Sequence, residues 1–165
     1  MDSAVRALDL PRRIRYADPD TSGLVCGADP QHVRIARRWA MQATRTTPCL
    51  AHPLVVSLAE LHTNALKHSA SGLLSGRVRI EIERRERLFL LRVTDEGARP
   101  GGGITVPEVR AGAGVEKREP ALAEGGYGLA LVDAMALYWD FTGGEGGPVT
   151  VRAAFDRSGR PRPRP

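Results

Sequence analysis

The sequence predicts an α+β domain, a two-layer sandwich in which helices cover one face of an antiparallel-rich mixed sheet. The order of patterns predicts this class: helix, helix, strand pair, long loop, helix, strand pair. The two strands of each pair follow one another closely in the chain, as in antiparallel hairpins. The length of 165 residues suits one domain that can bury its own core.

The chain before the first helix is expected to contribute little regular structure. RRIRYA (12–17) is a short strand candidate, and the following residues up to Ala28 are expected to form a loop. A helix should begin at Asp29-Pro30, because a capping carboxylate followed by proline is a helix-start signal. This helix should continue through residues 31–44, where its apolar residues recur at helical spacing: Val33, Ala36, Ala40 and Ala43, with Trp39 beside them.

A second helix is expected to follow the proline-containing stretch TTPCLAHP (46–53). The two prolines in this stretch should interrupt the helical conformation and so separate the two helices. We therefore expect the second helix to begin near Pro53 and to end near Ser69. The stretch SASGLLSG (69–76) then reads as a polar connection that contains glycine.

Two strand pairs are expected in the rest of the chain. GRVRIEIE (76–83) alternates apolar and charged residues as a half-buried strand does, and LFLLRVT (88–94) is more continuously apolar. Residues 96–126 are rich in glycine and show no period, so they predict a long loop that is either functional or disordered. A helix is expected at 127–139, and two further strands at YWDFTG and PVTVRAAF.

Composition narrows the classes of function. The net charge is +5, but the last ten residues, DRSGRPRPRP, carry four Arg and one Asp, so the rest of the chain carries only +2. No motif that reads nucleic acid accompanies the charge, so no direct nucleic-acid partner is expected. The two cysteines do not form a disulfide framework. Neither a membrane-spanning run nor a signal peptide is recognised, which predicts a cytoplasmic protein without membrane contact.

Three parts of the chain are expected. Residues 1–28 form an N-terminal segment that contributes at most one strand, and residues 29–155 form the domain. The domain includes a loop at about residues 98–125 that is expected to act as a lid. Residues 156–165 form a Pro/Arg tail with nothing to bury, which predicts disorder.

The second helix carries an unusual stripe of polar groups. At about 100° per residue, the residues that fall within about 80° of Glu60 on the helical wheel are Ser57, Asn64, Lys67 and His68. A separate apolar arc, centred about 130° away, holds Leu54, Leu58, Leu61 and Ala65. The helix therefore has one stripe for the core and another for functional groups. An ordinary solvent-facing stripe is the alternative interpretation.

Two further motifs follow in order. VTDEG (93–97) ends an aliphatic strand in Asp95-x-Gly97. EGGYGLALVDAM (124–135) opens a helix with Gly126-x-Gly128-Leu129. Each motif alone indicates only a turn or the start of a helix. The occurrence of both motifs, in this order, after the Glu60 to Ala65 motif is much more specific evidence than either motif alone.

Together the three motifs resemble the GHKL-type ATPase domain, also called the histidine-kinase-like ATPase fold. The N-box of that family carries Glu-x-x-x-Asn-Ala, here Glu60 to Ala65; its G1 box carries Asp-x-Gly, here Asp95 to Gly97. Its G2 box carries Gly-x-Gly-Leu, here Gly126 to Leu129. The resemblance covers roughly residues 30–155. The chain length leaves room for neither a transducer domain nor a dimerising helix pair, so it is most similar to the stand-alone bacterial anti-sigma factor serine/threonine kinases.

The resemblance implies a site for ATP and Mg²⁺ between the helices and the sheet. It implies that Asp95 accepts the adenine amino group, that Gly97 lets the backbone approach the purine, and that Asn64 binds Mg²⁺ through its amide oxygen. Glu60 would be the catalytic base. The remaining nucleotide-binding residues implied are Lys67, His68, Gly126, Gly128 and Leu129.

The resemblance also implies partners. A kinase of this branch binds a sigma factor and phosphorylates a Ser or Thr of an antagonist (anti-anti-sigma) protein. Small domains of this branch often pair, so a homodimer is compatible with it. The chain departs from the branch at Tyr127, where arginine is more usual, and in its last strand, where the branch commonly has a lysine and a tryptophan. Both departures bear on how firmly the γ-phosphate is held.

Three functions stay open at this point. The first is the ATP-dependent kinase and anti-sigma regulator, favoured by the intact Glu60 and Asn64. The second is a nucleotide-gated protein-binding module with little or no catalysis, favoured by the glycine-rich lid and the G2 departure. The third is a plain ATP hydrolase, which would lack a transducer domain to use the energy.

Overall fold

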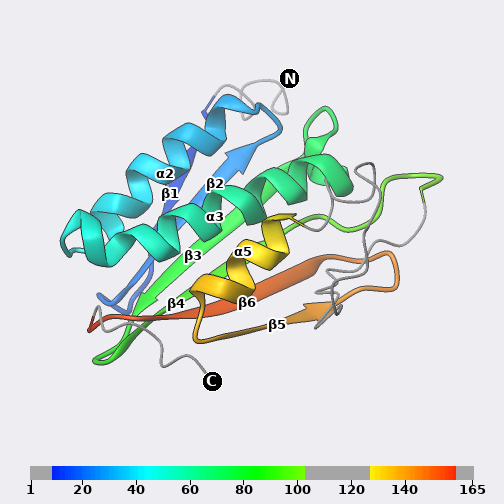
Figure 1. Cartoon of the computed structure of the whole chain (residues 1–165). Coiled ribbons are helices and arrows are strands. Elements are labelled where there is room, and N and C mark those ends of the chain that lie inside the picture. The colour runs from blue at the N-terminus through cyan, green and yellow to red at the C-terminus, as the bar shows by residue number, and fades with distance from the viewer. Residues whose placement is uncertain (1–8, 103–126, 159–165) are drawn as a thin grey trace, which may run out of the picture.

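The computed structural model describes residues 9–102 and 127–158. Figure 1 shows a sheet with helices packed across one of its faces. In chain order, the elements are β1 (Arg12–Ile14), β2 (Thr21–Gly27), α2 (Gln31–Ala43), α3 (Pro48–His68), the 3₁₀ turn η1 (Ala70–Gly72), β3 (Arg77–Arg84), β4 (Leu88–Thr94), α5 (Tyr127–Met135), β5 (Tyr138–Gly143) and β6 (Val149–Asp156).

The described sheet has six strands in the order β1-β2-β3-β4-β6-β5. Every neighbouring pair in it is antiparallel. The two-layer α+β class predicted from the sequence is therefore confirmed, with antiparallel pairs throughout the described sheet where a mixed one was expected. Helices α2, α3 and α5 lie on the same face of this sheet (Figure 1).

The core lies between that face and the helices. The alternation of β3 and β4 puts one set of side chains under the helices. The fully or nearly fully buried members of this set are Val78, Ile80, Ile82, Phe89, Leu91 and Val93. The predicted apolar arc of α3 packs onto them, and all four of its residues are buried: Leu54, Leu58, Leu61 and Ala65.

The loop expected up to Ala28 is wrong, because residues Thr21–Gly27 form strand β2. This strand pairs with β3 over its whole length. Its sequence, TSGLVCG, has two glycines and weak strand propensity, so the pairing partner rather than the local sequence decides its conformation. Gly23 has a specific reason to lack a side chain, since a Cβ there would lie 2.7 Å from Tyr16 Cε2.

The first helix begins where the sequence predicts. Asp29 Oδ1 accepts a hydrogen bond from the Gln31 amide at 2.9 Å, and the Asp29 carbonyl accepts one from the His32 amide at 3.0 Å. The helix ends at Ala43, one residue before the expected end. The helix-start signal in the sequence is therefore confirmed.

Helix α3 begins at Pro48 rather than near Pro53. Thr47 caps it, because its Oγ1 accepts a hydrogen bond from the Leu50 amide at 3.4 Å, and Pro48 occupies the first turn, where proline is tolerated. Pro53 lies inside the helix and costs one backbone hydrogen bond. The deeply buried Leu54 beside it shows what this stretch gains by staying helical.

The C-terminal elements differ from the prediction in their boundaries, and β6 covers Val149–Asp156 where residues 148–155 were expected. Helix α5 ends at Met135 and not at 139, because the chain turns there into β5. The Leu137 amide already donates to the Ala154 carbonyl of β6 at 2.7 Å. Most of the predicted lid and the end of the Pro/Arg tail lie outside the described residues. Within the described ranges, each helix is too short or too polar to cross a bilayer.

Candidate functional site

The polar stripe of α3 lies at the C-terminal half of the helix. Glu60 and Asn64 are half-buried, one helical turn apart, whereas Lys67 and His68 are exposed in the last turn. Glu60 and Asn64 lie on the face that the helical wheel predicts. Neither side chain makes a hydrogen bond or an ion pair with another described residue, so both remain available for a ligand.

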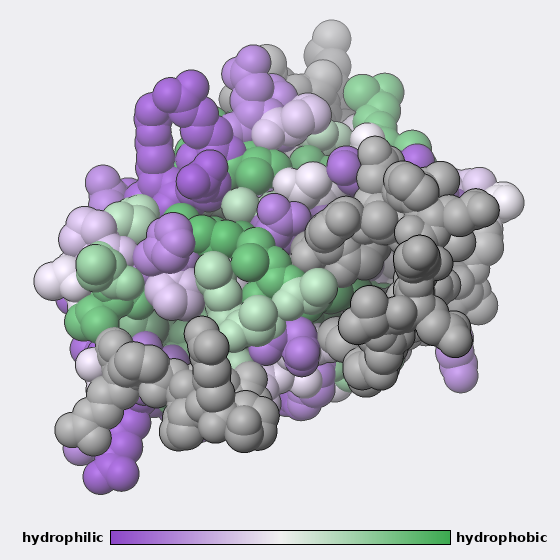
Figure 2. All heavy atoms as spheres, viewed as in Figure 1, coloured by the Kyte–Doolittle hydropathy of each residue, from purple (hydrophilic) through white to green (hydrophobic). Residues whose placement is uncertain are grey.

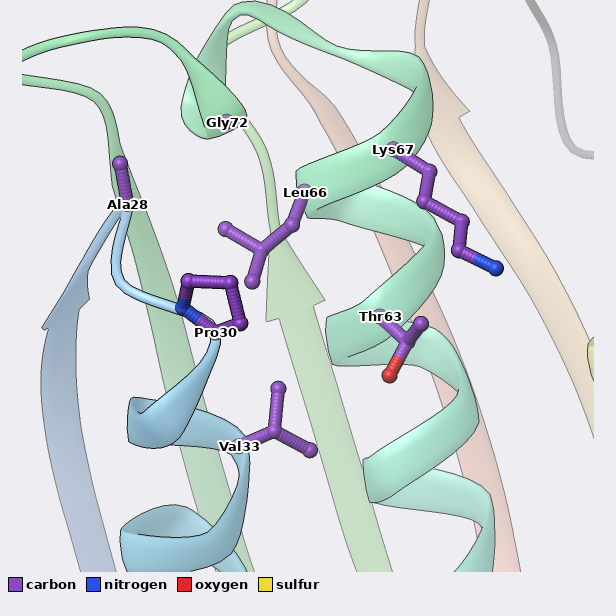
Figure 3. A pocket seen from close by; sticks show the side chains of 7 residues that line it. All are labelled: Ala28, Pro30, Val33, Thr63, Leu66, Lys67 and Gly72. Carbon is purple, nitrogen blue, oxygen red and sulfur yellow. The ribbon is translucent and has the colours of Figure 1, made fainter.

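An apolar hollow lies between α2 and α3, and Lys67 is among the residues that line it. Figure 3 shows Pro30, Val33 and Leu66 facing one another between α2 and α3, with the ammonium group of Lys67 directed away from them. This hollow has a volume of about 420 Å³ and is lined mainly by apolar groups. Its mainly apolar lining therefore offers little to the charged phosphates of a nucleotide.

Asp95 follows β4 directly and is held in one orientation by backbone amides. Its Oδ1 accepts hydrogen bonds from the Gly97 amide at 2.7 Å and from the Val149 amide at 3.2 Å. Its own amide donates to the Val149 carbonyl at 2.9 Å. Burial raises the pKa of this carboxyl, and the two amide bonds partly offset that rise. Oδ2 bonds to no other described residue and is left as an oriented acceptor.

Gly97 occupies a conformation that favours glycine. Its φ is +86°, in the left-handed region. A Cβ at this position would also collide with the carbonyl of Gly147 in the loop between β5 and β6. The glycine of the Asp-x-Gly motif is therefore required by close backbone packing as well as by its own torsion angle.

The segment after Asp95 is bonded to the end of α3. The Ala70 amide donates to the Gly97 carbonyl at 2.8 Å, and the Glu96 amide donates to Ser71 Oγ at 3.0 Å. Arg99 donates to two carbonyls at the end of the same helix. Sequence reasoning treated residues 69–76 as a plain connection and missed this contact. No signal in the sequence points to it, because the residues that meet are 25 to 33 positions apart.

The third motif is described in part. Gly126 lies outside the described residues, and Gly128 is in the first turn of α5. The side chain of Leu129 is 6% exposed and belongs to the hydrophobic core. Figure 1 shows that the C-terminal half of α3, the end of β4 and the start of α5 gather at the same end of the domain. The three motifs thus come together, although they are far apart in the sequence.

The family model of the histidine kinase-like ATPase domain matches residues 26–153. The chain belongs to this family. No curated relative matches the chain. The matched range includes α2, α3, the hairpin of β3 and β4, and α5, which together position all three motifs.

ATP fits the donors and acceptors of this histidine kinase-like ATPase domain. The adenine amino group is a donor, and Asp95 Oδ2 is an acceptor without a partner among the described residues. The fixed orientation of the carboxylate means that little order is lost when a base binds. Family membership thus makes ATP the expected nucleotide, and the geometry at Asp95 agrees with it.

The residues present also fit a cation carried by the nucleotide. Among the described residues, no cluster of three or more His, Cys, Asp or Glu could form a protein cage for a metal. Mg²⁺ does not need such a cage, since it keeps several waters and binds substrate phosphates alongside one or two protein oxygens. The half-buried amide of Asn64 is the described group that would supply that oxygen.

Proposed function

We propose that this protein is an ATP-dependent serine/threonine kinase of the anti-sigma type. It transfers the γ-phosphate of ATP with Mg²⁺ to a Ser or Thr of an antagonist protein, and it sequesters a sigma factor. The observation that carries the proposal is the pair formed by Glu60 and Asn64. They share one half-exposed face of α3, at the end of the domain that also holds the oriented Asp95.

Each residue has a distinct role. Asp95 binds the adenine amino group, and the amide oxygen of Asn64 holds the metal. Glu60 takes the proton from the attacking hydroxyl as the new phosphate ester forms. Bound ATP supplies the phosphoryl group and leaves as ADP. Lys67 and His68, in the last turn of α3, stabilise phosphate charge, as the resemblance implies.

The surface of the helical layer supports a protein partner. Figure 2 shows a hydrophobic strip across the middle of the face that α3 and α5 present, with hydrophilic side chains gathered over α2. The half-buried or exposed apolar residues of these two helices include Pro53, Val56, Ala59, Ala130 and Ala134. Exposed apolar strips with a polar border commonly mark protein contacts. We assign this strip to the sigma factor or the antagonist.

The ATP site is tested by calorimetry. Mg-ATP should bind the wild-type protein, and binding should weaken when Mg²⁺ is removed. Asn64→Ala should weaken Mg-ATP binding by about 10- to 100-fold, the effect of losing one contact to a charged group. Gln42→Ala is the matched control, since Gln42 is exposed on α2. Equal Mg-ATP affinity in wild type and Asn64→Ala would exclude the assigned metal role.

Catalysis is tested at Glu60. Glu60→Gln keeps the shape of the side chain but removes the base, so phosphoryl transfer should fall by about 10²- to 10⁴-fold while Mg-ATP binding changes little. The measurement is label transferred from γ-labelled ATP to the antagonist protein. Glu86→Gln, an exposed glutamate between β3 and β4, is the control. Transfer that survives Glu60→Gln unchanged would exclude Glu60 as the base, and no transfer by the wild type would count against a kinase.

One observation favours a second function. Tyr127 stands at the start of α5 in the position where the family branch usually has arginine, and Arg99 is engaged elsewhere. Both facts reduce the positive charge available to the γ-phosphate. The protein would then be a nucleotide-gated binding module, in which ATP changes partner affinity without transfer. Partner binding that responds to ATP in Glu60→Gln as in wild type, with no transfer in either, would select this function.

A further inference from the structure

Arg99 joins the segment that follows Asp95 to the end of helix α3. Its Nε donates to the Ser69 carbonyl at 3.0 Å, and its Nη2 donates to the Leu66 carbonyl at 2.9 Å. Leu66 and Ser69 lie in and just after the last turn of the helix, which also carries Lys67 and His68. One side chain from residues 95–99, which we call the G1 segment, thus holds two backbone carbonyls at the end of α3.

The end of a helix is a favourable place for this guanidinium. The last carbonyls of a helix have no intrahelical partners, and the negative end of the helix dipole attracts a cation. Hydrogen bonds from a charged donor are stronger than neutral ones. Gly72 leaves the space for this contact, since a Cβ there would collide with the Leu66 carbonyl and lie 3.2 Å from Arg99 Nη2.

The G1 segment is fixed on both sides. Toward α3, the Ala70 amide bonds to the Gly97 carbonyl at 2.8 Å, in addition to the two bonds from Arg99. Toward the loop between β5 and β6, the Ala98 amide bonds to the Gly146 carbonyl at 3.2 Å. Among these described contacts, the Arg99 guanidinium is the charged group that bonds to α3, whereas the Asp95 carboxylate bonds to the Val149 amide of β6.

We propose that Arg99 is a positioning residue that fixes the Asp95 segment on the end of α3, and so sets the distance between the adenine subsite and the metal and phosphate subsite. The part that concerns ATP rests on the function proposed above. Arg99 touches neither subsite directly. It acts through Asp95, four residues before it, and through the helix turns that carry Asn64 and Lys67.

This role predicts which ligands depend on Arg99 for their affinity. A ligand that occupies both subsites benefits from their fixed separation, because the second contact then forms with little loss of freedom. A ligand that occupies one subsite gains little from it. Loss of Arg99 should therefore weaken Mg-ATP much more than adenosine.

The experiment compares both ligands by calorimetry in wild type, Arg99→Ala, Arg99→Lys and the control Arg87→Ala. Arg87 is exposed in the turn between β3 and β4. We expect Arg99→Ala to weaken Mg-ATP by at least about tenfold and adenosine by less than about threefold. Arg99→Lys should recover much of the loss, because an ammonium group can still donate to these carbonyls. Amide hydrogen exchange without nucleotide, at Ala70 and Glu96, is followed in the same four proteins.

The outcomes separate this inference from the proposed function. If Arg99→Ala keeps wild-type affinity for Mg-ATP, or if its affinities for Mg-ATP and adenosine fall by the same factor, the positioning role is overturned. If even the wild type binds no Mg-ATP, the proposed function fails and hydrogen exchange decides. Faster exchange at Ala70 and Glu96 in Arg99→Ala, but not in Arg87→Ala, would then support the positioning role, and unchanged exchange would overturn it.

Discussion

His62 lies in the middle of α3 and is fully buried, yet neither of its ring nitrogens has a partner in the described part of the chain. Burial and, to a smaller extent, the nearby His32 lower the pKa of this imidazole from 6.5 to about 4. The ring is therefore neutral inside the fold at neutral pH. An unpaired buried polar group costs free energy, so His62 is a point where the core is less stable than it would be with an apolar residue.

The pH dependence of stability follows from this pKa. Between about pH 6.5 and 4 the unfolded chain protonates His62 and the folded chain does not, so the free energy of unfolding falls as the pH falls through this window. The loss attributable to His62 is about 3 kcal/mol. His62→Leu should remove this pH-dependent loss and raise the free energy of unfolding at all pH values. The measurement is urea unfolding from pH 7 to pH 4.

The control for His62 is on the same helix. His52→Leu makes the same substitution at an exposed histidine of α3, so it controls for the introduction of leucine on this helix. The shared carboxylates titrate equally in all three proteins, so only the difference between profiles matters. If His62→Leu shows the same loss of stability as the wild type between pH 6.5 and 4, burial does not depress the pKa of His62.

The residues of the site divide into those that the sequence predicts and those that it does not. The sequence predicts Glu60, Asn64 and Asp95 as site residues, because each belongs to a short motif whose spacing is itself chemical information, and their roles stay predictions. It does not predict Arg99 and Ser71, since their partners depend on where the G1 segment meets α3 in space. No spacing rule in the sequence joins residue 99 to the Leu66 carbonyl.

The same division holds at the scale of elements. Helix α2 and the β3–β4 hairpin could be predicted because their apolar period and caps are local. Strand β2 could not, because it is a strand only by pairing with β3. The sequence predicts too late a start for α3, because a proline such as Pro53 usually breaks a helix and the buried face of α3 outweighs this effect.

One buried side chain ties three of these elements together. Arg84, at the end of β3, is 4% exposed. Its guanidinium donates to the Ala43 carbonyl at the end of α2, to the Pro19 carbonyl and to Ser22 Oγ. A run of arginines between two strands suggests a solvated turn, but this one member caps a helix. The position of α2 on the sheet thus depends partly on a contact that no periodicity reveals.

The whole molecule is an open sheet with two exposed edges in its described part, β1 and β5. These edges differ in character. The edge strand β1 has three residues, two of which are exposed arginines, and short charged edges resist pairing with another chain. The strand β5 is longer and exposes Tyr138 (56%) and Phe141 (37%). If the protein forms a homodimer through a sheet edge, β5 is therefore the edge that we expect it to use.

Edge strands should open locally more readily than central strands, and native-state hydrogen exchange of the free monomer tests this difference. Amides in β3, β4 and β6 should exchange slowest, because each of these strands has a partner on both sides and lies next to the helical layer. Amides of β1 and β5 should exchange faster through local opening, since each has one partner strand. The measurement is repeated over a wide range of protein concentration. Slow exchange in β5 that disappears on dilution would contradict a free edge and show that β5 pairs with a second copy.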